Sequence, residues 1–234
     1  MRQLLNDIPL IDQVALCLCI AIWVMFEIVN DHTRFRFNSL SGLMARKRRE
    51  WMLVLADREL RIVDTSIIAG LQNGTVFFAS TCIFAIGGCF ALINSADVAL
   101  DIYRDLSIEE PLSRSVFEMK VLGLALIFIY SFFKFAWSAR LFNYCAILIG
   151  SVRQPSDAEQ AERRKQALVA AEVNIIASRH FTAGLRGIFF ALGYLGWFIG
   201  PYMLVATTVF VLVVLVRRQY FSQARKVLLD EQVP

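Results

Sequence analysis

The sequence predicts an all-α fold, a polytopic transmembrane helix bundle with amphipathic cytoplasmic helices. Of its 234 residues, 57% are hydrophobic and 19% are charged, and the mean hydropathy is +0.56. Soluble domains carry about 45–50% apolar and about 25% charged residues. The apolar residues also lie in runs of about 18 or more, the length that a membrane-crossing helix needs. We therefore expect a single membrane domain over residues 1–234.

The first apolar run, residues 11–29, predicts a retained transmembrane helix whose N-terminus lies outside. Only Arg2 precedes it as a cation, Asp7 and Asp12 oppose that charge, and no small-residue cleavage site follows. The next segment, residues 30–65, is basic and is placed in the cytoplasm because cytoplasmic loops are enriched in Lys and Arg. Its eight cations are Arg34, Arg36, Arg46, Lys47, Arg48, Arg49, Arg58 and Arg61.

Residues 44–63 within this segment predict an amphipathic helix on the cytoplasmic face. Trp51, Leu55 and Ile62 recur near helical spacing, and the cations around them would contact anionic lipid head groups. A nucleic-acid role for residues 46–49 is the alternative. Basic clusters beside membrane spans are the common result of topology determination, so we expect no nucleic-acid partner.

The second span, residues 66–93, carries small residues that predict helix packing. Ser66, Gly70 and Gly74 recur every four residues, so they share one helix face and would let another helix approach closely. Gln72 and Asn73 lie near the cytoplasmic end of the same span.

The connection at residues 94–115 is acidic and is expected outside, because it holds few cations. Asp97, Asp101 and Asp105 would stripe one helix face, and we prefer a solvated face over a cation site. The only histidines, His32 and His180, show no ligand-like spacing to the cysteines. The sequence therefore predicts no metal site and no cofactor.

The third span, residues 121–149, is followed by a second cytoplasmic segment at residues 150–177. Ser156 is the expected N-cap of the helix in this segment, with Glu159 three residues later as in a capping box. We expect this helix to lead directly into the fourth span, residues 178–199.

The last apolar stretch is interrupted by Gly200 and Pro201, which favour a chain reversal. A turn there gives spans at residues 178–199 and 202–219, hence five spans and a cytoplasmic C-terminus. The alternative is four spans with one kinked last helix. The five-span interpretation is preferred because it places the four C-terminal cations inside. These cations are Arg217, Arg218, Arg225 and Lys226.

Several motifs resemble, in order, a bacterial and plant family of polytopic membrane proteins that is catalogued only as a domain of unknown function. The matching segments are RREWM at residues 48–52, Asp64, GLQNGTVFFAST at 70–81, FFKFAWSAR at 132–140, GLR at 184–186 and WFIGP at 197–201. The resemblance covers about residues 10–220. It implies a membrane location and a helical architecture, and it supplies no activity, cofactor or site residues.

Charged residues inside the spans are the candidate functional residues, because each costs about 2.5–3.5 kcal/mol at a helix centre on insertion scales. If the helices bundle, Lys134, Arg186, Gln72 and Asn73 converge in one layer of the inner leaflet. Together with Arg140 they are candidates for binding an anion or a lipid head group. Internal pairing is the other explanation, and the available carboxylates are Glu27 and Asp64.

The sequence shows no nucleotide-binding loop, nucleophile elbow or metalloprotease motif, so we expect no enzymatic activity. The preferred hypothesis is an inner-membrane channel or transporter for a small anion that uses this cationic layer. Such a protein could form a homo-oligomer. The alternative is a non-catalytic membrane scaffold that acts through its basic cytoplasmic helices and binds anionic head groups.

Overall fold

The computed structural model describes residues 9–32, 37–105, 113–156 and 158–230, and within these ranges every regular element is a helix. This confirms the predicted all-α class. The elements are α2 (Leu10–His32), α3 (Leu40–Ala56), α4 (Ile62–Asn94), α5 (Ala96–Asp105), α6 (Arg114–Ser151), α7 (Gln160–Tyr194), the 3-10 helix η2 (Leu195–Phe198), α8 (Pro201–Tyr220) and α9 (Gln223–Asp230). Arg2, Asp7, Arg34, Arg36 and the side chain of Asp105 lie outside the described part.

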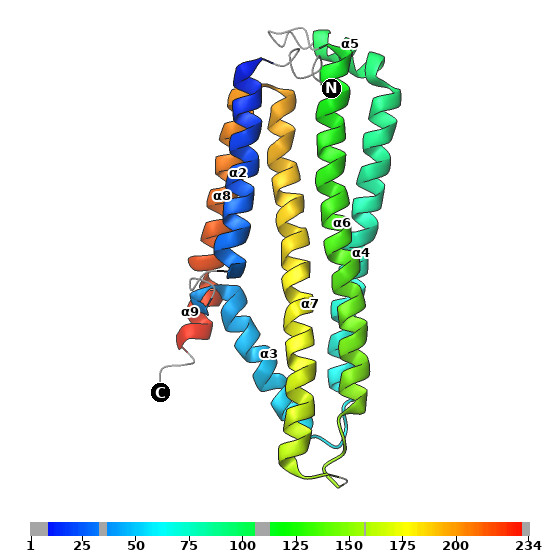
Figure 1. Cartoon of the computed structure of the whole chain (residues 1–234), viewed down its shortest axis with the longest axis vertical. Coiled ribbons are helices and arrows are strands. Elements are labelled where there is room, and N and C mark those ends of the chain that lie inside the picture. The colour runs from blue at the N-terminus through cyan, green and yellow to red at the C-terminus, as the bar shows by residue number, and fades with distance from the viewer. Residues whose placement is uncertain (1–8, 33–36, 106–112, 157, 231–234) are drawn as a thin grey trace.

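Five helices of the described residues are long and apolar enough to cross a membrane, as expected for a multi-pass membrane protein. The last two are separated by the predicted break. Helix α7 passes into η2, the chain turns at Gly200, and α8 begins with Pro201, a first-turn position that lacks an intrahelical N–H partner in any case. Figure 1 shows α7 and α8 as separate helices in the bundle. They are two separate candidate spans rather than one kinked helix.

The helices are of unequal length, so the two ends of the bundle differ. Helix α6 has 38 residues and is about 57 Å long, whereas the hydrocarbon core of a bilayer is about 30 Å thick. Even a tilt of about 40° leaves α6 too long for the core. Helices α2 and α8 run beside only one part of α7, and α3 covers the other (Figure 1). We call the two ends the α5 end and the α3 end.

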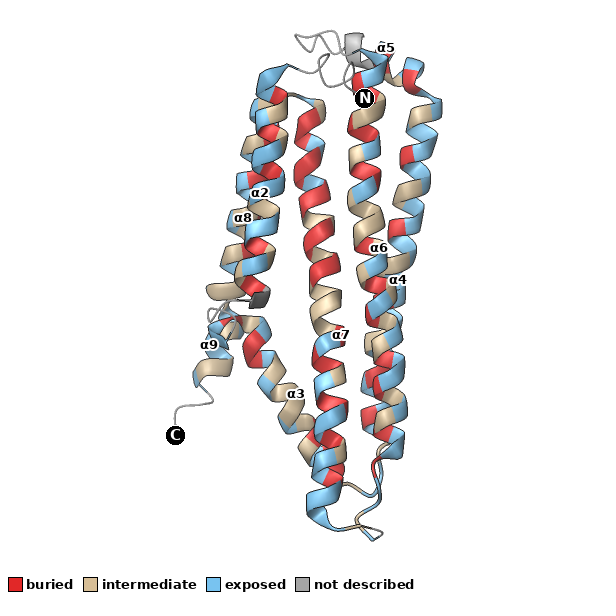
Figure 2. Ribbon diagram, viewed as in Figure 1, coloured by how far each residue is buried: buried red, intermediate tan, exposed pale blue. Residues whose placement is uncertain are grey.

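Helix α7 lies at the centre and is the most buried of the five spans (Figure 2). Helices α2, α4 and α8 turn much of their apolar surface outward, with Phe77, Phe84 and Phe210 at least 66% exposed. Large exposed apolar surfaces mark contact with lipid or with another protein. The pattern fits helices that face hydrocarbon around a central α7.

The helix predicted at residues 44–63 has different bounds in the structure, and α7 covers part of its apolar face. Helix α3 ends at Ala56, and Ile62 is an exposed residue of α4. Met52 and Leu55 are fully buried in a cluster that includes Ala167, Ala170 and Ala171 of α7. These small side chains let α3 pack closely on α7, so this part of its apolar face is covered by protein.

Within this chain, two local features of α4 and α7 differ from those expected. Ser66, Gly70 and Gly74 are exposed, and a side chain added at either glycine would meet nothing within 4 Å. Helix α4 packs on α6 through a different face, which contains its buried residues Ile68, Thr75, Cys82 and Cys89. Helix α7 begins at Gln160, and its N-cap is Glu159 rather than Ser156.

The close helix contact that does need glycine lies between α6 and α7. A Cβ atom at Gly184 would stand 2.8 Å from the ring of Phe135, and one at Gly187 would stand 2.2 Å from Ser131 Oγ. Small residues at these two positions therefore bring the central helices together, which is the role that the sequence pattern had assigned to α4.

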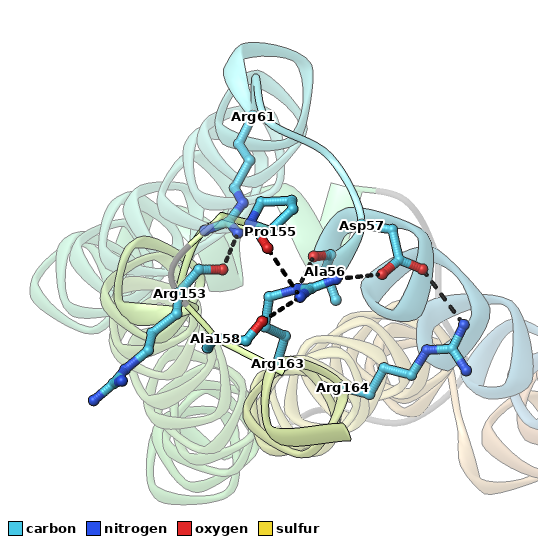
Figure 3. A network of polar contacts seen from close by, with 8 residues as sticks. All are labelled: Ala56, Asp57, Arg61, Arg153, Pro155, Ala158, Arg163 and Arg164. Carbon is cyan, nitrogen blue, oxygen red and sulfur yellow. Dashed lines mark hydrogen bonds and ion pairs between the residues drawn. The ribbon is translucent and has the colours of Figure 1, made fainter. Parts of the chain in front are cut away.

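Two arginines close helix ends at the α3 end (Figure 3). Arg163 donates to the carbonyl oxygens of Ala56 at 3.2 Å and of Ala158, and forms an ion pair with Asp57 at 3.2 Å. Arg61 donates to Ile149 O at 3.3 Å and to other carbonyls after the end of α6. The last carbonyls of a helix have no partner within it. These two arginines therefore hold the α3–α4 and α6–α7 connections in place. Carbonyl groups before α7 accept hydrogen bonds from Arg163, and Ser156 does not cap the helix.

Candidate functional site

A polar cavity opens about midway along α7, where the end of α2, the first half of α3 and the end of α8 meet it. Its larger part has a volume of about 250 Å³, and a smaller pocket adjoins it. The residues that line both parts are Asn30, Ser41, Arg48, Ser178, Thr182, Arg186 and Gln219. Arg179 lines the smaller part and Arg218 the larger.

Helix contacts around the cavity hold its polar lining in place. Asn30 of α2 donates to Phe26 O at 2.8 Å and accepts from the Tyr220 hydroxyl of α8 at 3.1 Å. Gln219 of α8 donates to Ser41 Oγ of α3 at 2.9 Å. These contacts join α2, α3 and α8, so the cavity walls are positioned by groups far apart in the sequence.

Arg48 enters the cavity from α3 and is held from behind by α7. Its Nη1 donates to Asn174 Oδ1, and Asn174 Nδ2 in turn contacts Cys145 Sγ of α6 at 3.4 Å. The buried Arg48 Nε has no hydrogen-bond partner among the described residues. Burial lowers the pKa of the Arg48 guanidinium, and the nearby Cys145 raises it by less. The group remains a cation, so a bound negative charge would offset its lost hydration.

Arg186 lies on the membrane side of the same cavity and forms a buried ion pair. Its Nη2 donates to Glu27 Oε2 of α2 at 2.8 Å, and the two side chains are 6% and 19% exposed. Arg218 stands 5.9 Å from the ring centroid of Phe189. Within the described residues that line the cavity there is no Asp or Glu. The cavity is therefore cationic, and hydroxyl and amide groups are available to complete the shell of an anion.

A second, mainly apolar hollow lies between α2 and α6. Helix α2 contacts chiefly α8, and α6 contacts chiefly α7 and α4, so α2 and α6 leave between them a groove floored by α7 and η2. Its volume is about 800 Å³, within the range of about 300–1,000 Å³ that ligand pockets occupy. Leu16, Trp23, Leu126 and Phe190 are among its walls, and Glu27 and Lys134 lie at one end.

The two hollows meet at the Glu27–Arg186 ion pair. Glu27 lines the groove but not the cavity, and Arg186 lines the cavity but not the groove. The pair therefore forms part of the wall between a polar, basic compartment and an apolar one that faces the bilayer.

A buried polar cluster at the α5 end was missed by sequence reasoning. Lys120 Nζ donates to Trp197 O at 2.8 Å, stands 3.8 Å from Asp12 Oδ1, and lies 5.0 Å from the Trp197 ring centroid. Trp197 Nε1 also donates to Asp12 Oδ1. Lys120 falls just outside the expected third span, and only its i, i+4 position relative to Leu124 on a buried helix face could have indicated burial.

The structure separates the residues of the predicted cationic layer. Arg186 lines the cavity and Lys134 lines the groove, where its Nζ lies 5.2 Å from the Tyr130 ring centroid. Gln72 and Asn73 lie on α4, which packs mainly on α6, and they line neither hollow. Arg140 is exposed and donates to the Tyr144 hydroxyl at 2.6 Å.

The two carboxylates named as internal partners have different roles. Glu27 pairs with Arg186, as described above. Asp64 is fully buried and accepts from Trp51 Nε1 at 2.7 Å and from Arg58 Nη1 at 2.8 Å, so it ties α3 to α4 away from the charged spans.

In the predicted acidic stripe, Asp97 pairs with Arg114 at 2.9 Å. No group of three or more His, Cys, Asp or Glu side chains that could hold a metal occurs among the described residues.

Comparison with known families assigns the chain to the one that the motifs had suggested. A family model described as a protein of unknown function, DUF599, matches residues 14–224. The chain belongs to the DUF599 family. No curated protein and no solved structure matches it. The matched part of this DUF599 protein includes the residues that form the cavity and the ion pair between the two hollows.

Proposed function

We propose that this DUF599 protein is a multi-pass inner-membrane protein that binds a small inorganic anion in the polar cavity and conducts or transports it. The observation that carries the proposal is that the half-buried Arg48 and the buried Arg186 line the same cavity, whose described lining holds no carboxylate. Buried arginine is costly unless it is paired and hydrogen-bonded. Arg186 already pairs with Glu27, whereas Arg48 donates to the neutral amide of Asn174, so an oxyanion in the cavity would supply the negative charge that Asn174 does not carry.

The orientation of the bundle supports access from the cytoplasm. Most cations of the described residues lie toward the α3 end, whereas the α5 end holds Asp97, Asp101 and few cations. Because cytoplasmic loops are enriched in Lys and Arg, this distribution favours a cytoplasmic α3 end. Five spans then place the start of α2 outside and α9 inside, and the cavity faces the compartment with the cellular anions.

In this proposal, the Glu27–Arg186 pair keeps the transport pathway closed. An anion that reaches Arg186 competes with the Glu27 carboxylate for the same guanidinium, and like-charge repulsion moves Glu27 away. Loss of the pair opens the wall between the cavity and the groove. The structure is then the closed conformation, and anion entry shifts the equilibrium toward an open one.

Binding to the purified protein tests the cavity. Potassium phosphate, sulfate and chloride are titrated at constant ionic strength, and stabilisation is followed by the melting temperature, since a ligand stabilises the state that it binds. Arg48→Gln should weaken the response at least about tenfold, the value of one charge-assisted hydrogen bond. Arg46→Gln is the matched control, because Arg46 is an exposed cation of the same helix. Equal responses of the two variants would contradict the proposal.

Flux through reconstituted vesicles tests the second half of the proposal. Vesicles loaded with an anion-sensitive dye should show protein-dependent entry of the anion that binds best. Saturable binding without flux would leave a binding protein and refute transport. This measurement also separates the proposal from a scaffold role, which requires no flux.

The scaffold hypothesis has less support in the arrangement of the basic helices. Arg48 donates to Asn174, Arg49 pairs with Glu172 at 2.6 Å, and Lys47 pairs with Glu50 at 2.8 Å. These side chains of α3 are engaged within the chain, so the basic run offers a smaller free surface than its sequence implies.

A further inference from the structure

We propose that the groove between α2 and α6 is a binding site for an anionic phospholipid of the leaflet at the α3 end. One acyl chain would lie along the apolar walls, and the phosphate would be held by Lys134. This site is distinct from the anion cavity, because Lys134 does not line the cavity and Arg48 does not line the groove.

The length and composition of the groove suit an acyl chain. The lining of the groove is apolar or aromatic except for Gly123, Glu27 and Lys134. The groove opens between two candidate spans. From Lys134 to Met119 it follows α6 for about 22 Å at about 1.5 Å per residue. One leaflet is about 15 Å of hydrocarbon, half of a core of about 30 Å. The groove is therefore long enough to hold the whole length of an acyl chain whose head group lies at Lys134.

The charges at the end of the groove select the head group. Glu27 is already paired with Arg186. Lys134 is half-buried and forms no ion pair within the described part of the chain, where its ammonium lies against the ring of Tyr130 at 5.2 Å. A lysine that borders hydrocarbon in this way binds a phosphate oxygen as a point charge. An anionic head group also offsets the cation more fully than a zwitterionic one does.

The aromatic side chains support a bound chain and also report on it. Trp23 lines the groove, stacks on Phe190 with ring centroids 5.4 Å apart, and meets the edge of Tyr130 at 5.2 Å. Trp23 thus positions Tyr130, the ring that the Lys134 ammonium contacts. The head-group region and the acyl-chain region of the site therefore share one wall. A lipid in the groove would lie in van der Waals contact with the Trp23 indole.

The test uses quenching of tryptophan fluorescence by lipids brominated on their acyl chains. The full chain is reconstituted in phosphatidylcholine with increasing brominated phosphatidylglycerol, or with brominated phosphatidylcholine instead. Subtracting the signal of Trp23→Phe, which keeps an aromatic ring at that position, isolates the contribution of Trp23. We expect half-saturation at a mole fraction of phosphatidylglycerol at least fivefold lower than that of phosphatidylcholine.

Three variants make the result specific. Lys134→Gln should abolish the fivefold preference, whereas Arg140→Gln should retain it, because Arg140 is an exposed cation of the same helix outside the groove. Leu126→Phe, which narrows the groove at a 65% exposed position, should reduce quenching by both lipids. Melting temperatures confirm that each variant is folded.

Three outcomes would overturn the proposal. The first is equal quenching by the two lipids, which means ordinary contact with the surrounding bilayer. The second is a preference that Lys134→Gln leaves intact. The third is quenching that falls as the protein density rises, together with cross-linking of two copies of a variant that carries Ile20→Cys and Leu126→Cys. That result would mean that a second chain fills the groove. Anion binding in the cavity is tested separately with Arg48→Gln and its control Arg46→Gln, so either proposal can fail alone.

Discussion

Neutralising Glu27 should strengthen anion binding while weakening the fold. In Glu27→Gln the side chain keeps its shape and a hydrogen-bond acceptor for Arg186, but it loses the charge that competes with an incoming anion. The contact is 2.8 Å long and both side chains are largely buried. A hydrogen bond between charged groups is worth about 1.5–3 kcal/mol and a neutral one about 1 kcal/mol. Glu27→Gln should therefore lower the stability of the folded protein by about 0.5–2 kcal/mol, and anion binding should become more favourable by the same amount.

This difference corresponds to an anion affinity about 2- to 30-fold higher than that of the unchanged protein. The assay is the titration of the melting temperature with phosphate, which reports the lower starting stability and the larger response in one experiment. Glu172→Gln is the control, because Glu172 pairs with Arg49 in a half-exposed contact away from the cavity. An affinity that is unchanged or lower in Glu27→Gln, at equal folding, would refute the competition between Glu27 and the anion.

Three further predictions concern the two ends of the bundle. Arg163→Met should cost about 3 kcal/mol, because it removes two charge-assisted bonds to carbonyls, and the melting temperature should fall by about 6–12 °C; Arg164→Gln, an exposed partner of the same carboxylate, should change it little. Lys120→Met should destabilise by about 3–5 kcal/mol because it breaks a buried pair, and adding Asp12→Asn should recover part of the loss in urea unfolding. Burial raises the pKa of Asp57, but donation from Arg163 and its neighbours outweighs this and lowers it. The resulting stability is present above the unfolded value of about 3.9 and is lost as the pH falls through the lower folded pKa, so the melting temperature of Asp57→Asn should depend less on acid than that of the unchanged chain.

Several elements were predictable because their signals are local. The membrane spans follow from the apolar runs, and the break between α7 and α8 follows from Gly200 and Pro201, since proline lacks the N–H that an interior helical turn requires. The direct passage of the charged segment after residue 158 into the fourth span was also read correctly. Each of these depends on neighbours within one or two helical turns.

Local spacing could not predict which helix faces meet within the chain. The spacing of Ser66, Gly70 and Gly74 is typical of a packing face, but α4 turns a different face to α6. The apolar residues of α3 predicted an amphipathic helix, and the pattern cannot tell a lipid surface from the alanine-rich face of α7, because both accept the same apolar side chains.

The sequence by itself determined that this DUF599 protein is an all-α membrane protein, where its spans lie, and which charged residues need an explanation. The tertiary structure decided which of these residues meet. Glu27 and Arg186 are 159 positions apart, and their contact depends on the order and rotation of the helices around α7. Hydropathy is summed along the chain and carries no such information. The cavity at Arg48 and the groove at Lys134 thus became visible only when α2, α3, α6 and α8 were placed around the central helix.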